Sequence, residues 1–239
     1  MTDTAKIALV TGGNKGIGLE IVRQLAAAGV TVLLGARDSA RGQAAAATLA
    51  GVHPIHIDLN DDATIAAAAA EIAATHGRLD ILVNNAGIVD AEDGPPSLAT
   101  VHAARRLMET NFLGTLAVTQ SMLPLLRKAP AARIVNLSTT LGSLAINGDP
   151  TSPYYEARLI GYNASKAALN MLTVQLAAEL RDTPIAVNAV APGYVKTDLT
   201  GHNGFMTPAE GAALPVKYAL MGPDAPSGTF VEPAGTAPW

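Results

Sequence analysis

Short apolar runs alternate with longer helical patterns along the chain, and this alternation limits the fold more than any other feature. Seven of the apolar runs are typical of strands: residues 7–11, 31–34, 53–58, 81–84, 133–138, 185–190 and 229–231. Helical patterns lie between them, at residues 17–28, 40–49, 64–76, 98–126, 162–181 and 208–220. Strands that alternate with helices form βαβ units, and strands buried on both faces are apolar throughout. The sequence therefore predicts an α/β fold with a parallel sheet.

Composition excludes several classes of protein. The chain has 239 residues, which suits one domain over residues 1–239, and no cysteine, which excludes disulfides and thiolate chemistry. Its net charge of −4 argues against a nucleic-acid partner, and it lacks the ~20-residue apolar stretch of a membrane span. His53 and His56 are spaced like metal ligands but lack obvious partners. We therefore expect a cytoplasmic protein without a metal site and without a nucleic-acid or membrane partner.

A glycine-rich turn follows the first strand and opens the first helix. Gly12, Gly16 and Gly18 have the spacing G-x-x-x-G-x-G. Such glycines allow a tight turn, the approach of a pyrophosphate, and close contact between helix and strand. The phosphates then meet the positive end of the helix. The turn predicts a dinucleotide site, with an ordinary glycine-rich turn as the alternative.

Cations stand where a fold that binds NAD usually carries an acidic residue. Arg37 follows the second strand, Arg41 lies one turn later, and Lys15 belongs to the glycine turn. A 2′-phosphate requires cations, and a guanidinium can bind it through two hydrogen bonds. Three solvated surface charges are the alternative, but their common location favours NADP over NAD.

Asp58 ends the third strand and is a candidate for the adenine amino group. An aspartate at a strand end is also a good helix cap, so this position has two interpretations.

Tyr162 and Lys166 are four residues apart in a helical segment, so both side chains can face one cleft. A phenol has a pKa near ~10, and a nearby cation favours the phenolate. We expect Lys166 to lower the pKa of Tyr162, which would make the phenol a workable acid or base. Together with the nucleotide turn, the pair predicts proton transfer beside a hydride carrier.

Several motifs in order resemble the short-chain dehydrogenase/reductase family, and in particular its carbonyl-reductase-like members. They are the turn at residues 11–18, Asn84-Asn85-Ala86-Gly87, Asn111 in Thr110–Gly114, Ser138-Thr139, Tyr162–Lys166 and the segment at residues 192–198. The resemblance covers nearly the whole chain. It implies a single Rossmann-type doubly wound domain with a seven-stranded parallel sheet, and reduction of small or medium ketones and aldehydes with NADPH.

The resemblance also implies roles for individual residues. Tyr162 would donate the proton, Lys166 would bind the nicotinamide ribose, and Asn111 would hold a water relay. The predicted catalytic residues are Asn111, Ser138, Thr139, Tyr162 and Lys166. The predicted cofactor-binding residues are Gly12, Asn14, Lys15, Gly16, Ile17, Gly18, Arg37, Arg41, Asp58, Leu59, Asn85, Ala86, Gly87, Tyr162, Lys166, Pro192, Gly193, Val195 and Thr197.

The chain departs from the family pattern at two places. The family usually has two serines where this chain has Ser138-Thr139, so Thr139 matches the serine that polarises the carbonyl. Ser138 is the alternative if the strand end twists. Thr139 and Tyr162 are also 23 residues apart, where the family commonly has about a dozen. The additional residues, 143–160, are expected to line the substrate pocket, with surface packing as the alternative.

The insertion also affects the predicted assembly. In the family, the helices predicted at residues 98–126 and 162–181 commonly pack between subunits, and the insertion precedes the second of them. We therefore expect a monomer or a small homo-oligomer. An NAD-dependent alcohol dehydrogenase, and a non-catalytic sensor that binds NADP, are the alternative functions.

Overall fold

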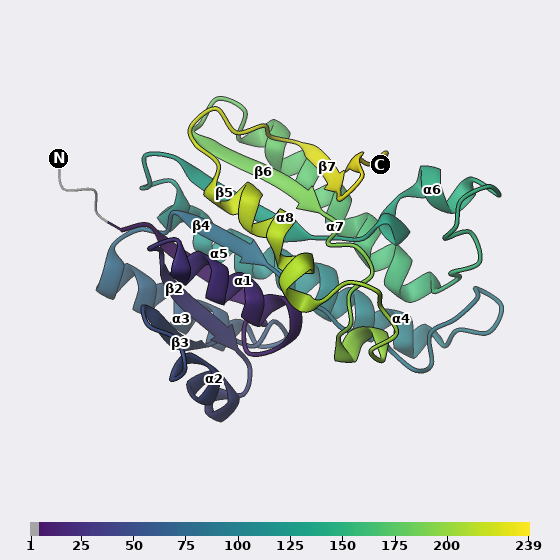
Figure 1. Ribbon diagram of the computed structural model, residues 1–239, viewed down its shortest axis with the longest axis horizontal. Coiled ribbons are helices and arrows are strands. Elements are labelled where there is room, and N and C mark those ends of the chain that lie inside the picture. The colour runs from purple at the N-terminus through teal and green to yellow at the C-terminus, as the bar shows by residue number, and fades with distance from the viewer. Residues whose placement is uncertain (1–4) are drawn as a thin grey trace.

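The computed structural model describes residues 5–239, so the first four residues of the predicted domain lie outside the described part (Figure 1). The strands are β1 (Ile7–Thr11), β2 (Thr31–Ala36), β3 (Val52–His56), β4 (Ile81–Asn84), β5 (Ala132–Leu137), β6 (Ile185–Val190), β7 (Thr229–Glu232) and β8 (Gly235–Thr236). The α-helices are α1 (Gly16–Ala27), α2 (Ser39–Ala46), α3 (Asp62–His76), α4 (Val101–Met108), α5 (Thr115–Leu126), α6 (Leu144–Gly148), α7 (Ile160–Glu179) and α8 (Pro208–Leu220).

One sheet contains all the described strands, in the order β3-β2-β1-β4-β5-β6-β7-β8. The first seven strands of this order pair in parallel, which confirms the predicted doubly wound α/β fold. The strand order reverses direction between β1 and β4. In open sheets of this kind, ligands bind beside the carboxyl ends of the strands at that point.

The sheet has an eighth strand that the sequence analysis missed. β8 pairs antiparallel with β7, with Glu232 opposite Gly235. Gly235 has a φ of 133°, a backbone conformation that favours glycine and permits the tight return of the chain. A strand of two residues is too short to show an alternating pattern, which is why the predicted number was seven.

The apolar core forms two layers, one on each face of the sheet, because successive strand residues point to opposite sides. Leu9 and Leu82 belong to the cluster that packs against α3, α5 and α7, whereas Val10 and Val83 belong to the cluster that packs against α1, α2 and α8. Figure 1 shows α1 and α8 on the near face, and α4 and α6 beyond the carboxyl ends of the strands. None of the helices in residues 5–239 has the length and apolar character needed to cross a bilayer.

The long helix predicted at residues 98–126 begins later and is irregular. It starts at Val101, after the side chain of Thr100 accepts a hydrogen bond from the N–H of Ala103. Between α4 and α5, residues Glu109–Gly114 form a π-helical segment, η1. Such segments frequently lie at functional sites, and this one contains Asn111.

Candidate functional site

The glycine turn after β1 has the close contacts that a dinucleotide site needs. Gly12 and Gly16 have φ values of 62° and 57°, in the left-handed region that favours glycine. A Cβ on Gly18 would lie 2.3 Å from the carbonyl oxygen of Gly12. Asn14 and Ile17, two of the predicted cofactor-binding residues, lie beside these glycines and are half-buried. The backbone here therefore leaves no space for larger residues at position 18.

The amino end of α1 suits an anionic ligand. The residue before the helix, Lys15, makes no side-chain capping bond, and the first turn of the helix contains no acidic residue. The first N–H groups of a helix attract phosphates, and here no side chain of the turn competes for them. The pyrophosphate of a dinucleotide therefore fits this end of the helix.

The segment after β4 is tied to the same turn. The side-chain amide of Asn85 donates to the carbonyl oxygens of Thr11 and Gly12 at 2.9 and 3.1 Å. The N–H groups of Asn85 and Ala86 in turn donate to the hydroxyl of Thr11, each at 3.1 Å. Asn85 therefore holds the shape of the turn with its side chain. Gly87 lies further along, where a Cβ would be 3.5 Å from Nζ of Lys166.

The three predicted cations have different surroundings. Lys15 forms an ion pair with Asp198 at 2.7 Å, and Arg41 lies 3.4 Å from Asp38. Arg37 is exposed, and within residues 5–239 no carboxylate lies within ion-pair distance of it. Of the three, Arg37 is therefore the cation that a 2′-phosphate would find uncommitted.

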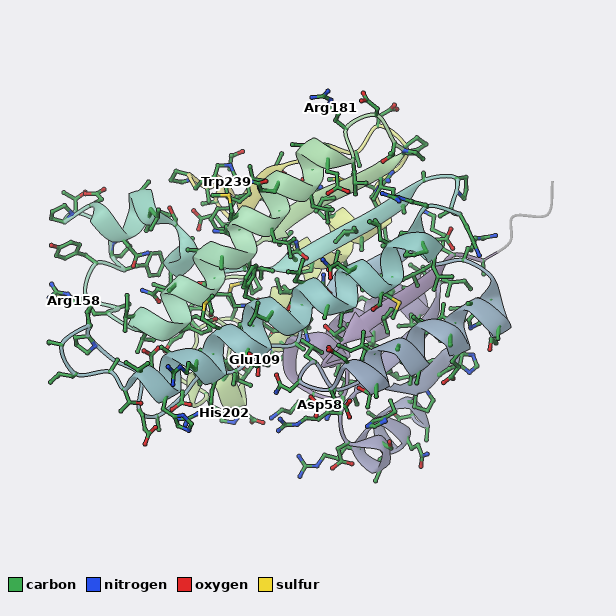
Figure 2. The ribbon with its side chains drawn as sticks, turned by 180° about the vertical axis from the view of Figure 1, so that it is seen from behind. Asp58, Glu109, Arg158, Arg181, His202 and Trp239 are labelled. Carbon is green, nitrogen blue, oxygen red and sulfur yellow. The ribbon has the colours of Figure 1, made fainter. Side chains whose placement is uncertain are left out.

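Asp58, labelled in Figure 2, was interpreted either as a contact for the adenine or as a helix cap, and the structure bears on the second interpretation. The cap of α3 is Asp61, whose side chain accepts from the N–H of Ala63, so Asp58 does not cap this helix. One oxygen of Asp58 accepts from the N–H of Asn60 at 3.0 Å. Leu59 is buried, with its carbonyl oxygen against Gly114.

Tyr162 and Lys166 lie in the first two turns of α7, and both are buried. Nζ of Lys166 lies 5.9 Å from the centre of the Tyr162 ring and donates to the carbonyl oxygen of Leu137 at 2.8 Å. Burial raises the pKa of Tyr162 to about 12 and lowers the pKa of Lys166 to about 8. The pKa of Tyr162 in the free protein is therefore raised and not lowered as expected, because burial removes water from around the phenol.

Asn111 connects three parts of the site. Its side-chain oxygen accepts from the N–H of Ile88 at 2.8 Å, and its amide donates to the carbonyl oxygen of Ile88 and to Oγ of Ser165 at 3.1 and 3.0 Å. It is completely buried in η1. The side chain of Asn111 therefore fixes the loop after β4 against α7.

Ser138 and Thr139 face different surroundings at the end of β5. Ser138 is buried and donates to the side-chain oxygen of Asn170 at 2.6 Å. Thr139 is half-buried, and its hydroxyl accepts from the N–H of Leu141 at 3.3 Å. Of these two residues, Thr139 is the one whose hydroxyl hydrogen has no acceptor among the described contacts and could donate to a ligand.

The segment after β6 returns to the glycine turn. Gly193, which follows Pro192, has a φ of 90°, and a Cβ there would lie 2.5 Å from the sulfur of Met206. Val195 is buried, and a Cβ on Gly16 would lie 3.5 Å from the methyl group of Thr197. The structure therefore brings Thr197 of this segment to the glycine turn. Asp198 adds the ion pair with Lys15, and His202, labelled in Figure 2, lies 3.2 Å from Asp198.

The inserted residues, 143–160, contain the short helix α6 and are held by hydrogen bonds to α7 and to the C-terminal residue, among others. The side-chain amide of Asn163 on α7 donates to the side-chain oxygen of Asn147 at 2.9 Å. The N–H of Ala145 donates to the carbonyl oxygen of Trp239, which stacks on Phe230 with ring centres 5.4 Å apart. The insertion therefore lies beside the first turn of α7, which carries Tyr162.

The sequence analysis missed Asp93, which lies in the loop after β4. Its carboxylate accepts from the N–H groups of Gly161 and Tyr162, each at 2.9 Å. The only signal in the sequence was the length of the loop at residues 90–97, because nothing local relates an aspartate to a helix that begins 67 residues later.

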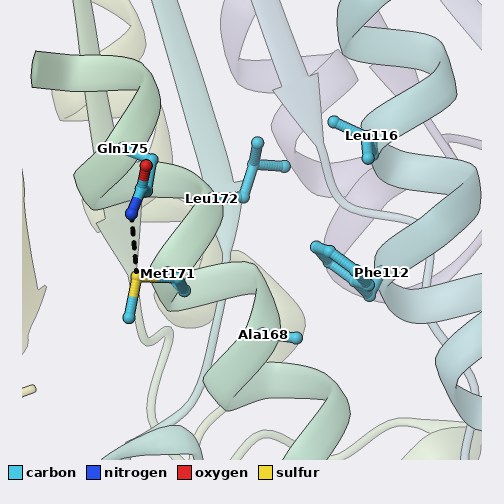
Figure 3. Close-up of a pocket in the computed structure, with 6 residues that line it drawn as sticks. All are labelled: Phe112, Leu116, Ala168, Met171, Leu172 and Gln175. Atoms are coloured by element: carbon cyan, nitrogen blue, oxygen red, sulfur yellow. Dashed lines mark hydrogen bonds between the residues drawn. The ribbon is translucent and has the colours of Figure 1, made fainter. Parts of the chain in front are cut away.

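An apolar hollow outside the predicted site lies between α7 and the helical run η1–α5 (Figure 3). Its lining residues are Phe112, Leu116, Ala168, Met171, Leu172 and Gln175. None of them is a predicted site residue. Residues 5–239 also contain no group of three or more side chains that could hold a metal ion.

Comparisons with known proteins identify the family and support the fold. The family described as short chain dehydrogenase matches residues 6–205. The chain is 34% identical to carbonyl reductase (NADPH) 1 of Homo sapiens, with 100% of both chains covered. It is 31% identical to (-)-isopiperitenone reductase of Mentha piperita, with 96% of this chain and 97% of that one covered. The crystal structure of NADPH-bound carbonyl reductase from chicken fatty liver superposes with a TM-score of 0.85 at 30% identity, covering 98% of this chain and 99% of that chain.

Proposed function

The chain belongs to the short-chain dehydrogenase family, and on this basis we propose that it reduces small or medium ketones and aldehydes, with Tyr162 as the proton donor. It is an NADP-dependent oxidoreductase. The observation that carries the proposal is the buried pair of Tyr162 and Lys166, which lies next to Gly87. Gly87 belongs to the segment after β4, which also supports the glycine turn through Asn85.

The surroundings of Tyr162 suit a proton donor. NADPH, when bound, supplies a hydride to the carbonyl carbon. The oxygen of the substrate then gains negative charge and needs a proton. Because burial raises the pKa of Tyr162 to about 12, the phenol keeps its proton throughout the neutral range. The donor form is therefore the form present when substrate arrives.

Lys166 supports the same step through its charge. Its pKa, lowered by burial to about 8, leaves the ammonium form predominant at neutral pH. Nζ lies 5.9 Å from the centre of the Tyr162 ring, so the ammonium stabilises the phenolate that remains after proton transfer. The hydrogen bond to the carbonyl of Leu137 holds Lys166 in this position.

We assign polarisation of the carbonyl oxygen to Thr139. Ser138 is buried and donates its hydroxyl hydrogen to Asn170, whereas Thr139 is half-buried and its hydroxyl hydrogen has no acceptor among the described contacts. A donor already in place where negative charge develops is typically worth ~3 kcal/mol in the transition state. Thr139 therefore fits the role that the second serine has in the family pattern.

The cofactor fits the remaining residues as follows. The glycine turn and the amino end of α1 would hold the pyrophosphate, and Arg37 would be the principal partner of the 2′-phosphate. Asp58 and Leu59 would contact the adenine. Val195 and Thr197 would hold the nicotinamide amide, and Asn111 would contribute to a water relay towards Lys166. We further propose a cytoplasmic monomer or small homo-oligomer whose partner is a small carbonyl compound.

The test is Tyr162→Phe, assayed by the loss of NADPH absorbance with a panel of ketones and aldehydes. The phenyl ring fills the same space and donates no proton, so turnover should fall ~10²–10⁴-fold while NADPH still binds. A variant that keeps more than about a tenth of the rate would show that Tyr162 is not the acid. If the unmodified protein binds NADPH but reduces no carbonyl compound, the sensor interpretation gains support.

A further inference from the structure

The first turn of α7 depends on a distant loop for its hydrogen bonds. The first N–H groups of a helix have no partner within the helix. Leu159, the residue that precedes α7, provides no side-chain bond. The N–H of Ile160 instead donates to the carbonyl oxygen of Gly94 at 3.0 Å.

The next two N–H groups of the helix share one carboxylate. Gly161 donates to Oδ1 of Asp93 and Tyr162 donates to Oδ2, each at 2.9 Å. Oδ1 also accepts from the N–H of Gly94 at 2.9 Å, which fixes the orientation of the carboxylate. Two adjacent loop residues thus satisfy the first three N–H groups of α7. The last of the three belongs to Tyr162 itself.

The loop that contains Asp93 is itself fixed to α4. Nε of Arg106 lies 2.6 Å from Asp90, and its Nη2 lies 2.8 Å from Glu92. The N–H of Thr100 donates to the carbonyl oxygen of Glu92 at 3.1 Å. The loop that carries Asp93 is therefore held in place by α4, and the carboxylate of Asp93 can in turn hold the first turn of α7 in place.

The start of α7 also lies against α4 with no space to spare. A Cβ on Gly161 would lie 2.7 Å from Cδ1 of Leu107 and 3.1 Å from Cα of Ala104. A shift of the first turn towards α4 is therefore blocked, and a shift away from it breaks the bonds to Asp93. The position of Tyr162 is thus fixed from two sides.

We infer that Asp93 is a positioning residue for the reaction: its carboxylate holds the first turn of α7 so that the phenol of Tyr162 meets the carbonyl oxygen. The inference rests on the proposed function of Tyr162. The end turns of helices fray when their N–H groups lack partners. Tyr162 is the third residue of α7 and would move with the frayed turn, whereas Lys166 lies one turn deeper and is held by Leu137. A displacement of about 1 Å can cost ~10²-fold in rate.

The test compares two helix-capping aspartates. Asp93→Ala removes the acceptor for α7, and Asp61→Ala removes the equivalent acceptor for α3, which carries no catalytic residue. At saturating NADPH, and per NADPH-binding site, we expect kcat to fall on the order of 10-fold in Asp93→Ala and less than about 2-fold in Asp61→Ala. Asp93→Asn keeps one acceptor oxygen and should lose less than Asp93→Ala. Equal kcat values in the two alanine variants would overturn the inference.

A second measurement uses the free protein and needs no substrate. Hydrogen–deuterium exchange of the amides of Gly161 and Tyr162 should be faster in Asp93→Ala than in the unmodified protein or in Asp61→Ala, because these two amides lose their acceptor. Unchanged exchange there would overturn the inference whatever the activity. The two proposals also fail separately. If Tyr162→Phe retains its rate, the proposed function fails; if it loses its rate while Asp93→Ala keeps kcat, only the positioning role fails.

Discussion

Removing one or the other of the two hydroxyl groups at the end of β5 should have different effects: loss of the Thr139 hydroxyl should lower kcat, and loss of the Ser138 hydroxyl should lower stability. Thr139→Val keeps the shape of the side chain and removes the hydroxyl. If this hydroxyl donates to the carbonyl oxygen, its loss costs ~3 kcal/mol in the transition state, which lowers kcat roughly 10²-fold. The stability should change little, because the only described bond that is lost is the 3.3 Å contact with the N–H of Leu141 in a half-buried position.

Ser138→Ala should have the opposite profile. The hydroxyl of Ser138 donates to Asn170 at 2.6 Å in a buried position, and the side-chain amide of Asn170 donates to the carbonyl oxygen of Gly142. The substitution leaves a buried acceptor without its donor, which typically costs ~1–3 kcal/mol of stability. For a chain of this size, that corresponds to a decrease of several degrees in Tm. The effect on kcat should stay below about 10-fold.

The assay measures kcat at saturating NADPH with one ketone, together with thermal unfolding of each variant. Thr139→Ser is the matched control, since it keeps the hydroxyl and loses only a methyl group, and its kcat should remain within about 3-fold of the unmodified protein. If Ser138→Ala loses more rate than Thr139→Val, Ser138 polarises the carbonyl and the assignment to Thr139 is wrong.

Two further predictions concern the charged groups. The unmodified protein should use NADPH at least ~10-fold more efficiently than NADH, as measured by the ratio of the two kcat/KM values. Arg37→Asp should erode or invert this ratio, whereas Arg41→Asp should change it less because Arg41 already lies beside Asp38. Equal use of both cofactors by the unmodified protein would contradict the argument from the cations. Because burial lowers the pKa of Lys166 to about 8 from its usual 10.5, the unfolded chain binds more protons than the folded one between these values, so the free energy of unfolding should rise with pH across this window, by on the order of 3 kcal/mol. Urea titrations should show this rise in the unmodified protein and not in Lys166→Met, and an equal rise in both would contradict it.

Local signals in the sequence were sufficient for most of the fold. The apolar runs predicted all seven parallel strands, because strands covered on both faces consist mostly of apolar residues. The bounds of β1, β4 and β6 agree with the predicted ranges. The end of β3 did not: it was predicted to extend to Asp58 but ends at His56. Where a strand stops pairing depends on its neighbour, which the sequence of the strand does not contain.

The site was predictable where one residue type has one physical role. Gly12 and Gly18 are needed for backbone geometry, and the spacing of Tyr162 and Lys166 follows from the helix period. The pKa of Tyr162 was not predictable in this way, because its direction depends on how much water the fold removes from both groups. Asp93 was not predictable either, since its partners lie 68 and 69 residues away.

The three cations proposed to bind the 2′-phosphate show the same limit, and they bear directly on the choice between NADP and NAD. Lys15, Arg37 and Arg41 were equivalent in the sequence, yet Lys15 is paired with Asp198 across 183 residues of chain. Both partners of this pair are exposed by about three-fifths, at 62% and 61%, so salt and water screen their attraction. A phosphate with two negative charges can therefore compete with Asp198 for Lys15, but only by exchanging one ion pair for another. Arg37 needs no such exchange, since no described carboxylate neutralises it, so the preference for NADP should depend on Arg37 more than on Lys15.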